Sequence, residues 1–338
     1  MAFRPDRRFE SLEDAFKFLL GEQARHPVEK TWVKTPSGIV VPQEVPTYLY
    51  RGECGEFETT FSNLQRPGTY VLKDGRRLSD IDRKALRQLI LGLAHLFVDK
   101  KVYELDEPQA YGLFQHYGLP TPLIDFTGEL GRAFAFAALG GAKVGRVAEM
   151  HLLKASAVAK VVSFVGHPWA ERAQRQAAFG VVPMGELFDL KSGSARLNMD
   201  IRWFEFPVSQ SDQDYFDAKY VDLLRWTNDP SAGFLRFHIT EFIQASGKLS
   251  PELTDWLLER VPVAPYCYIA KSFEGEDVVV NFRSAEDLKN FDETTERTHS
   301  QLYWSSAHPG CHSKDRLSKF EWSPVGEITY DPRTYHPD

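Results

Sequence analysis

The 338-residue sequence has few cysteines and no long apolar run. Its three cysteines, Cys54, Cys267 and Cys311, are far apart, which argues against a disulfide framework and indicates a reducing compartment. No stretch approaches the roughly 18 apolar residues that a membrane-spanning helix needs. The charged N-terminus lacks the apolar core of a secretory signal peptide. We therefore expect a cytoplasmic protein that does not associate with a membrane.

Common catalytic and nucleotide-binding motifs are also missing. The sequence has no Walker phosphate loop, no Gly-x-Gly-x-x-Gly after a predicted strand and no Gly-x-Ser-x-Gly motif. The net charge of −7 argues weakly against coating of nucleic acid by bulk electrostatic attraction. His308, Cys311 and His312 lie close together, but adjacent Cys and His residues rarely bind one ion. We expect a loop there and no metal site.

The composition is that of a globular protein, with 43% hydrophobic and 26% charged residues. Apolar periodicity predicts helices at residues 9–20, 81–98, 107–117, 130–139, 168–178, 215–226 and 251–261. Strands are predicted at 48–50, 123–126, 144–153, 161–165, 201–206, 234–239, 266–270 and 278–282, with another beginning at 181. Because the order is irregular, without repeated βαβ units, we predict an α+β fold with a mixed or antiparallel sheet and flanking helices.

No low-complexity linker divides the chain. We predict an N-terminal helix and irregular segment over residues 1–45, a central domain over 46–185, and a C-terminal α+β region of unknown type over 186–338. The C-terminal region is expected to pack on the central domain as one body.

Tyr50-Arg51-Gly52 stands at the end of a predicted strand, where side chains often face a cleft. Gly52 permits close approach of the backbone to another group. The planar guanidinium of Arg51 suits bidentate contacts with phosphate or carboxylate groups. An internal ion pair that pins the strand end is the alternative interpretation.

The segment from Gln115 to Thr127 is predicted to contain a helix end, a tight turn and a short strand. Alternation in that strand places Leu123, Asp125 and Thr127 on one face. A carboxylate in so apolar a run needs a cation or several donors, which makes Arg51 a candidate partner of Asp125. Alternatively, Asp125 or Thr127 caps the helix that follows.

His116 lies at the end of a predicted helix, within the same segment. A histidine there could act as a general acid or base, or could anchor a ligand. The alternative is a structural group whose hydrogen bonds are satisfied inside the fold.

These features together resemble the FRG domain family, which is named after a Phe/Tyr-Arg-Gly motif. The resemblance rests on Tyr50-Arg51-Gly52, on the block from Gln115 to Thr127 and on the Ala- and Phe-rich helix after it. It covers roughly residues 45–185. The third family element is an Arg ahead of an Ala-Gln-Gln-Gly-like stretch, which Arg172 and Gln176 match. The sequence departs from the family at Pro122, where Arg or another polar residue is common.

The arrangement of the family is similar to that of ADP-ribosyltransferase-type domains, which implies a split sheet and NAD as the substrate. Carried over by position, Arg51 would hold the ribose or diphosphate of NAD and Thr127 would supply a hydroxyl. Asp125 would orient Arg51 or stabilise positive charge at the anomeric carbon. The candidate catalytic residues are Arg51, Asp125, Gln176 and His116; those expected to contact NAD are Tyr50, Arg51, Gly52, Thr121, Thr127 and Arg172.

The resemblance leaves two functions open. One is an NAD-consuming enzyme, either an ADP-ribosyltransferase or an NAD glycohydrolase, acting as a bacterial toxin or phage-defence effector on a protein or nucleic-acid acceptor. However, Gln176 stands where those enzymes have a late Glu, and an amide carries no negative charge. The other function is therefore a non-catalytic module that binds nucleotide, nucleic acid or protein through the same arginine-centred pocket.

Overall fold

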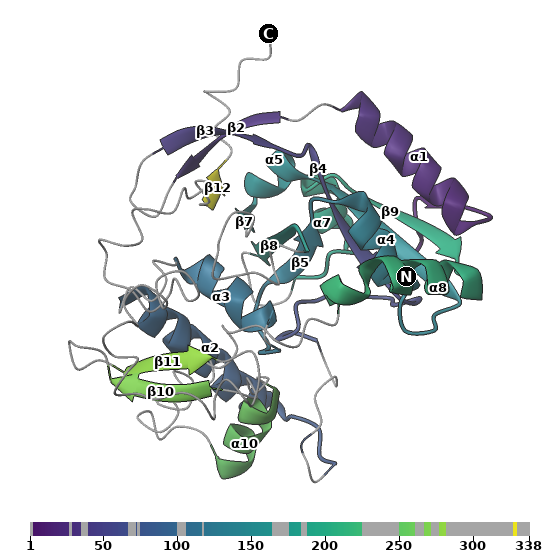
Figure 1. Cartoon of the computed structure of the whole chain (residues 1–338). Helices are drawn as coiled ribbons and strands as arrows, with labels where there is room; N and C mark the ends of the chain where they lie inside the picture. Colours follow the sequence, from purple (N-terminus) through teal and green to yellow (C-terminus); the bar gives the residue numbers. More distant parts are fainter. Residues whose placement is uncertain are drawn as a thin grey trace.

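The computed structural model describes residues 3–26, 29–34, 40–66, 72, 75–99, 106–116, 118–163, 176–183, 188–224, 250–260, 267–271, 277–281 and 327–329 (Figure 1). Within these ranges, no helix is long and apolar enough to cross a membrane. The strand predicted at 234–239, the residue Arg172 and the loop predicted around Cys311 lie outside them.

A ten-stranded sheet runs through the protein in the order β1-β9-β6-β4-β5-β8-β7-β12-β2-β3. Its neighbouring strands are antiparallel except for β1 and β9, which are parallel. The strands are β1 (Arg7–Arg8), β2 (Glu29–Lys34), β3 (Val40–Val45), β4 (Tyr48–Glu53), β5 (Ile124–Thr127), β6 (Val144–His151), β7 (Ala159–Ser163), β8 (Ala178–Pro183), β9 (Ile201–Pro207) and β12 (Glu327–Thr329). A separate two-stranded sheet pairs β10 (Cys267–Lys271) with β11 (Asp277–Asn281). This mixed sheet with flanking helices confirms the α+β prediction.

The described helices are α1 (Leu12–Arg25), α2 (Asp80–Asp99), α3 (Glu107–His116), α4 (Leu130–Ala138), α5 (Leu152–Ser156), α7 (Gly193–Asn198), α8 (Gln210–Leu224) and α10 (Pro251–Arg260). Local sequence determines several of their ends. Ser11 caps α1, because its hydroxyl accepts a hydrogen bond from the backbone N–H of Asp14 at 3.1 Å. The predicted helices at 81–98, 107–117 and 130–139 are confirmed within a residue or two.

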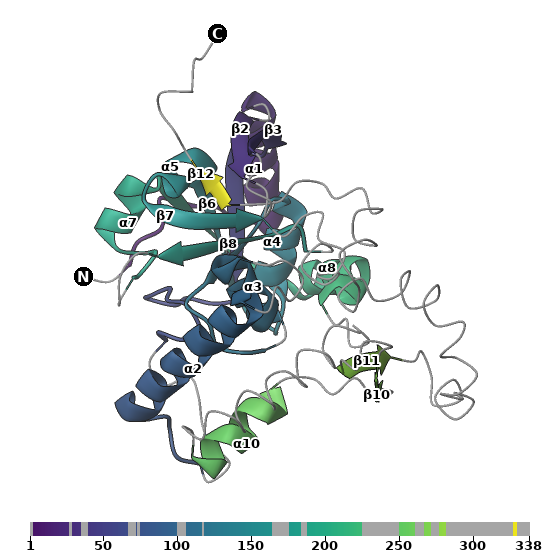
Figure 2. The same ribbon diagram turned by 90° about the vertical axis from the view of Figure 1, so that its left-hand side faces the viewer.

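Three apolar clusters hold the layers together. One lies on a single face of the sheet, and includes Leu49 of β4, Phe126 of β5 and Trp203 of β9. The opposite face is covered by two helix groups (Figures 1 and 2). Helices α1, α4 and α8 cover the β4-β6-β9 part, whereas α2, α3 and α10 cover the β5-β8-β7 part. The boundary between the two groups therefore falls at the β4–β5 junction.

Gly52 allows β4 and α4 to approach each other closely. A Cβ atom at Gly52 would lie 1.9 Å from the backbone oxygen of Ala133 and 2.7 Å from the backbone nitrogen of Ala137. No side chain can be placed there without moving α4. The close approach expected for this glycine is confirmed, and the group that approaches is a helix of the same chain.

Three predicted boundaries are wrong. The strand predicted to extend to residue 153 ends at His151, because the chain turns there into the short helix α5. The helix predicted to extend to residue 178 cannot do so, because β8 begins at Ala178 and pairs with Thr127 of β5. The helix predicted from residue 215 begins earlier, at Gln210. In the first two cases apolar residues continue across the boundary, and in the third the first turn of α8 is polar, so apolar periodicity alone does not mark these boundaries.

Candidate functional site

The sheet is joined across the β4–β5 junction by a single pair of residues. Tyr50 pairs with Thr127, whereas β4 pairs with β6 at six positions and β5 pairs with β8 at four. The two halves of the sheet are therefore held to each other at one register position. Arg51 is the first residue of β4 beyond this pair.

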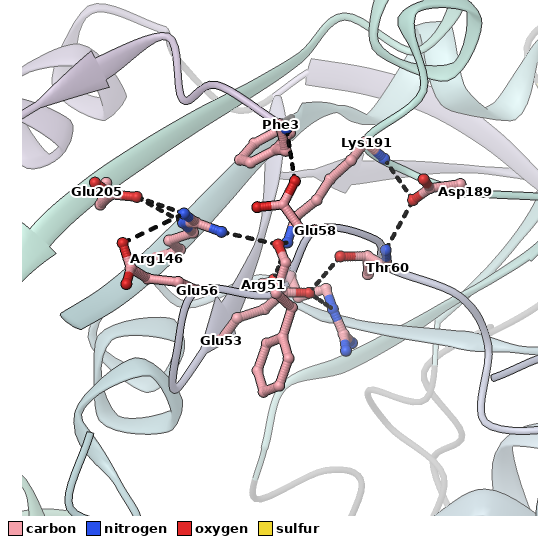
Figure 3. Close-up of polar contacts among 11 residues, drawn as sticks. Phe3, Arg51, Glu53, Glu56, Glu58, Thr60, Arg146, Asp189, Lys191 and Glu205 are labelled. Carbon is pink, nitrogen blue, oxygen red and sulfur yellow. Dashed lines mark hydrogen bonds and ion pairs between the residues drawn. The ribbon is translucent and has the colours of Figure 1, made fainter. Parts of the chain in front are cut away.

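Arg51 is hydrogen-bonded at one end of its guanidinium group and faces a carboxylate at the other, where its buried Nε has no hydrogen-bond partner among the described residues. Its Nη1 donates a hydrogen bond to the backbone carbonyl of Asp125 at 2.8 Å, and its Nε lies 3.5 Å from Oε1 of Glu53. The Arg51 side chain is 17% exposed. Within the described part of the chain, Glu53 is its acidic partner (Figure 3).

The predicted ion pair between Arg51 and Asp125 is wrong. Because Tyr50 pairs with Thr127, the antiparallel register brings Asp125 opposite Gly52. Successive side chains of a strand point to opposite faces, so the Asp125 carboxylate points away from the face that carries Arg51. Asp125 thus orients Arg51 through its carbonyl oxygen. Its buried Oδ1 has no hydrogen-bond partner among the described residues.

Thr127 is engaged in holding neighbouring backbone. Its hydroxyl donates to the carbonyl oxygen of Gln176 at 2.8 Å and accepts from the N–H of Glu129 at 3.1 Å. Glu129 directly precedes α4, so the Thr127 hydroxyl binds a backbone N–H at the start of that helix. This is close to the helix-capping role considered for Thr127 as the alternative. The contact brings Thr127 and Gln176 together in the described fold, although through the backbone of Gln176.

Thr121 and His116 lie on the α3 side of the junction. Thr121 is fully buried, donates a hydrogen bond to the Gln115 side chain and accepts one from the N–H of Leu123 at 3.3 Å. These bonds shape the turn between α3 and β5. His116 is buried at the end of α3, and the contacts described for Arg51 do not include it.

A row of charged residues with alternating signs crosses the face of the sheet that carries Arg51. Glu53 of β4 pairs in register with Arg146 of β6, Arg146 with Glu205 of β9, and Glu205 with Arg8 of β1. Arg146 Nη2 lies 2.7 Å from Oε2 of Glu205, and Arg8 Nε lies 2.9 Å from Oε1 of Glu205. We call this set the Glu53 row.

The carboxylate of Glu53 is held from the side by Lys191 and Thr60 (Figure 3). Its Oε2 lies 2.7 Å from Nζ of Lys191, and its Oε1 accepts a hydrogen bond from the Thr60 hydroxyl at 2.6 Å. Lys191 also donates to the carbonyl of Phe57 at 2.6 Å, as does Arg146 at 2.8 Å. Burial lowers the pKa of Lys191, and the Glu53 carboxylate opposes that shift.

The N-terminal segment closes over these cations. The Phe3 ring lies 4.8 Å from Nζ of Lys191 and 5.1 Å from Cζ of Arg146, both within cation–π range. Its backbone N–H donates to the Glu58 carboxylate at 2.8 Å. Phe3 therefore covers the buried end of the Lys191 side chain.

A second polar row crosses the opposite face of the sheet. Thr127, Tyr50, Glu149 and Arg202 pair in register across β5, β4, β6 and β9. Arg202 is hydrogen-bonded to Oε2 of Glu149. Burial raises the pKa of Tyr50 and of Glu149, with Arg202 opposing the shift of Glu149. We call this set the Tyr50 row.

Sequence reasoning missed the charged members of both rows. A signal was present, since Arg146 and Glu149 interrupt one apolar strand and Arg202 and Glu205 another. Residues three apart in a strand point to opposite faces, so each strand supplies one charge to each row. Among the described residues, no group of three or more His, Cys, Asp or Glu side chains could hold a metal ion.

Comparison with known families gives one match. The model of the FRG domain matches residues 46–143, which include β4, the Arg51 position, β5 and α4. No curated protein and no solved structure matches the chain. The matched region ends before β6, so Arg146, Glu149 and Gln176 lie beyond it.

Proposed function

We propose, from the premise that residues 46–143 form an FRG domain, that this protein consumes NAD as an ADP-ribosyltransferase or an NAD glycohydrolase. The observation that carries the proposal is the position of Arg51, a partly exposed arginine at the place where the sheet is joined by one residue pair. An arginine that is fixed by Asp125 and Glu53 can bind an anion without first losing much side-chain freedom.

The chemistry of the arginine supports a diphosphate ligand. A guanidinium has five N–H donors in a planar fork, and the hydrogen bond described for Arg51 uses Nη1. The donors that remain suit two oxygens of one phosphate group. A partly buried position strengthens such a contact, because water screens it less.

In the proposed reaction, the C–N bond between nicotinamide and ribose breaks and nicotinamide leaves with the bonding electron pair. The anomeric carbon bonds to an oxygen or nitrogen of a protein or nucleic-acid acceptor, or to water in a glycohydrolase. The proton of that nucleophile passes to solvent. Asp125 contributes by orienting Arg51 through its carbonyl oxygen, because its carboxylate lies on the opposite face of the sheet.

A product assay tests the proposal. Purified protein is incubated with NAD labelled on the adenylate and nicotinamide parts, alone, with cell lysate and with DNA. We expect nicotinamide release or label transfer that falls about hundredfold or more in Arg51→Ala. Arg51→Lys keeps the positive charge but not the planar set of N–H donors, so its activity should lie between those of the wild type and Arg51→Ala. Arg25→Ala is the matched control, because Arg25 is an arginine with a 75% exposed side chain on α1.

The alternative is a non-catalytic module with the same arginine-centred pocket. It is favoured by the hydrogen bonds of Thr127, which hold the backbone at Gln176 and at the start of α4. A module predicts saturable binding of NAD that is weakened in Arg51→Ala, with no product under any condition. Ligand-dependent stabilisation of the wild type against heat, absent in Arg51→Ala, would identify it. An unchanged product yield in a folded Arg51→Ala variant would contradict the enzymatic proposal.

A further inference from the structure

Arg51 and Glu53 are two residues apart on β4, so their side chains leave the same face of the strand. The Asp125 carbonyl binds the Nη1 end of the guanidinium, and Glu53 faces its Nε edge at 3.5 Å. An arginine side chain has several rotatable bonds, and one contact alone leaves its plane free to turn. A hydrogen bond at one end and an ion pair at the other restrict that plane.

Glu53 is itself buried and hydrogen-bonded. Its side chain is 5% exposed, and its two oxygens bind Thr60 and Lys191 at 2.6 and 2.7 Å. A carboxylate accepts about four hydrogen bonds, so these contacts leave Oε1 able to attract Arg51. At 3.5 Å the attraction is that of an ion pair, because the Nε of Arg51 forms no hydrogen bond among the described residues. Asp189 holds the two partners in place, because its Oδ1 accepts from the backbone N–H groups of Thr60 and Lys191 at 2.7 and 3.0 Å.

Lys191 changes the electrostatic consequence of having an acid next to Arg51. A carboxylate paired only with Arg51 would cancel much of the positive charge that an anionic ligand needs. The ammonium of Lys191, whose side chain is 1% exposed, lies closer to Glu53 than Arg51 does. The negative charge of Glu53 is therefore directed mainly to Lys191, and the charge of Arg51 is preserved.

We propose that Glu53 is a positioning residue that sets the plane of the Arg51 guanidinium for an anionic ligand group, and that Lys191 is its buried counter-ion. The identity of that group, the diphosphate of NAD, rests on the proposed function. The role of Glu53 differs from that of a catalytic residue, since both of its oxygens are bound by protein groups.

Whether Glu53→Gln weakens or strengthens the binding of an anion shows which of two roles Glu53 has: positioning Arg51, or only cancelling part of its charge. If Glu53 only weakened the field of Arg51, removing its charge would tighten the binding of an anion. If it positions Arg51, the same change loosens binding, despite the more positive surroundings. We expect the Kd for NAD to rise about tenfold, with KM following it and kcat little changed. A Kd that is unchanged or lower overturns the inference.

A double-variant cycle shows whether Glu53 acts through Arg51. In the Arg51→Ala background, Glu53→Gln should leave the Kd for NAD unaltered, because no guanidinium remains to be positioned. Equal effects in both backgrounds overturn the inference. Glu56→Gln is the matched control, because Glu56 lies three residues after Glu53 but its side chain is 61% exposed and 4.0 Å from Arg146. Its Kd should equal that of the wild type.

Two further measurements distinguish a loss of Arg51 positioning from misfolding and from a wrong choice of ligand. Glu53→Gln leaves Lys191 buried without its counter-ion. The variant Glu53→Gln/Lys191→Met, which removes both charges, is therefore measured as well and should show the same rise in Kd.

The second measurement needs no ligand. In NMR spectra of arginine-labelled protein, the Nε–H signal of Arg51 should shift, and its proton should exchange faster with water, in both variants. If the wild type does not bind NAD, the proposed function is wrong. The role of Glu53 is then tested by the Arg51 Nε–H signal alone, and a signal that is the same in the wild type and in the Glu53 variants overturns the inference.

Discussion

Tyr50 and Glu149 lie directly opposite each other on β4 and β6, and each has a buried oxygen without a hydrogen-bond partner in the described part of the chain. Both side chains are fully buried. The hydroxyl of Tyr50 and Oε1 of Glu149 therefore add a desolvation cost to the folded state, whereas Oε2 of Glu149 is bound by Arg202. This cost leads to two predictions about stability.

Tyr50→Phe should not destabilise the protein and should raise its free energy of unfolding by about 1 kcal/mol, because it removes an unpaired buried hydroxyl. Tyr111→Phe is the matched control: the Tyr111 hydroxyl donates to Glu107 at 2.8 Å, so its loss should cost about 1 kcal/mol. Urea unfolding of the three proteins measures both values. A large loss of stability in Tyr50→Phe would mean that its hydroxyl has a partner.

Glu149→Gln should change how stability depends on pH. Burial raises the pKa of Glu149 above its ordinary value of 4.5, so the folded protein keeps this proton at a pH where the unfolded chain has lost it. The folded state then binds more protons, and stability falls as pH rises from 4.5 through the raised pKa. Glutamine does not titrate, so the variant should gain stability relative to the wild type across this window. Parallel urea titrations at successive pH values test this; a constant difference would contradict it.

Gly52→Ala should destabilise the fold by about 3 kcal/mol or more, since its Cβ would overlap backbone atoms that cannot rotate away. The matched control is Gly21→Ala. A Cβ at Gly21 meets nothing within 4 Å, and the residue lies inside α1, so alanine should stabilise by about 0.5–1 kcal/mol. Thermal and urea unfolding give both values. Equal stability of Gly52→Ala and the wild type would show that α4 can move away from β4.

Asp125→Asn should leave stability within about 0.5 kcal/mol of the wild type, because Arg51 binds the backbone carbonyl and not the carboxylate. The same variant should keep its NAD turnover, because the carbonyl that orients Arg51 is unchanged. Unfolding and product assays on one preparation measure both properties. A loss of about 3–5 kcal/mol would instead indicate a buried ion pair with Arg51.

Local patterns in the sequence were sufficient for much of the fold. The helix α2 follows from apolar residues at helical spacing, and Ser11 marks the start of α1. The two faces of β5 also follow from alternation: Leu123 contacts the α2–α3 cluster, whereas Ile124 and Phe126 lie in the cluster on the other face. These features depend on residues close together in the chain.

The partners of Arg51 could not be found in the same way, because they depend on strand register. Asp125 was expected to bind Arg51 from its charge and its place in the family motif. A single pairing, Tyr50 with Thr127, turns that carboxylate to the other face and leaves Glu53 as the acid. Lys191 is 138 residues from Glu53, and nothing in its local sequence connects the two. Charged residues inside apolar strands indicated that counter-charges were needed, but not which ones.

The contact of Phe3 with the Lys191 and Arg146 cations has a practical consequence for preparing the protein. A tag fused to the N-terminus is attached two residues ahead of Phe3, whose ring lies against Lys191 and whose N–H is bound to Glu58. A charged purification tag at this end would bring its own ions to the Glu53 row and could compete with Glu58. Binding measurements on Arg51 and Glu53 variants should therefore be made after such a tag has been cleaved.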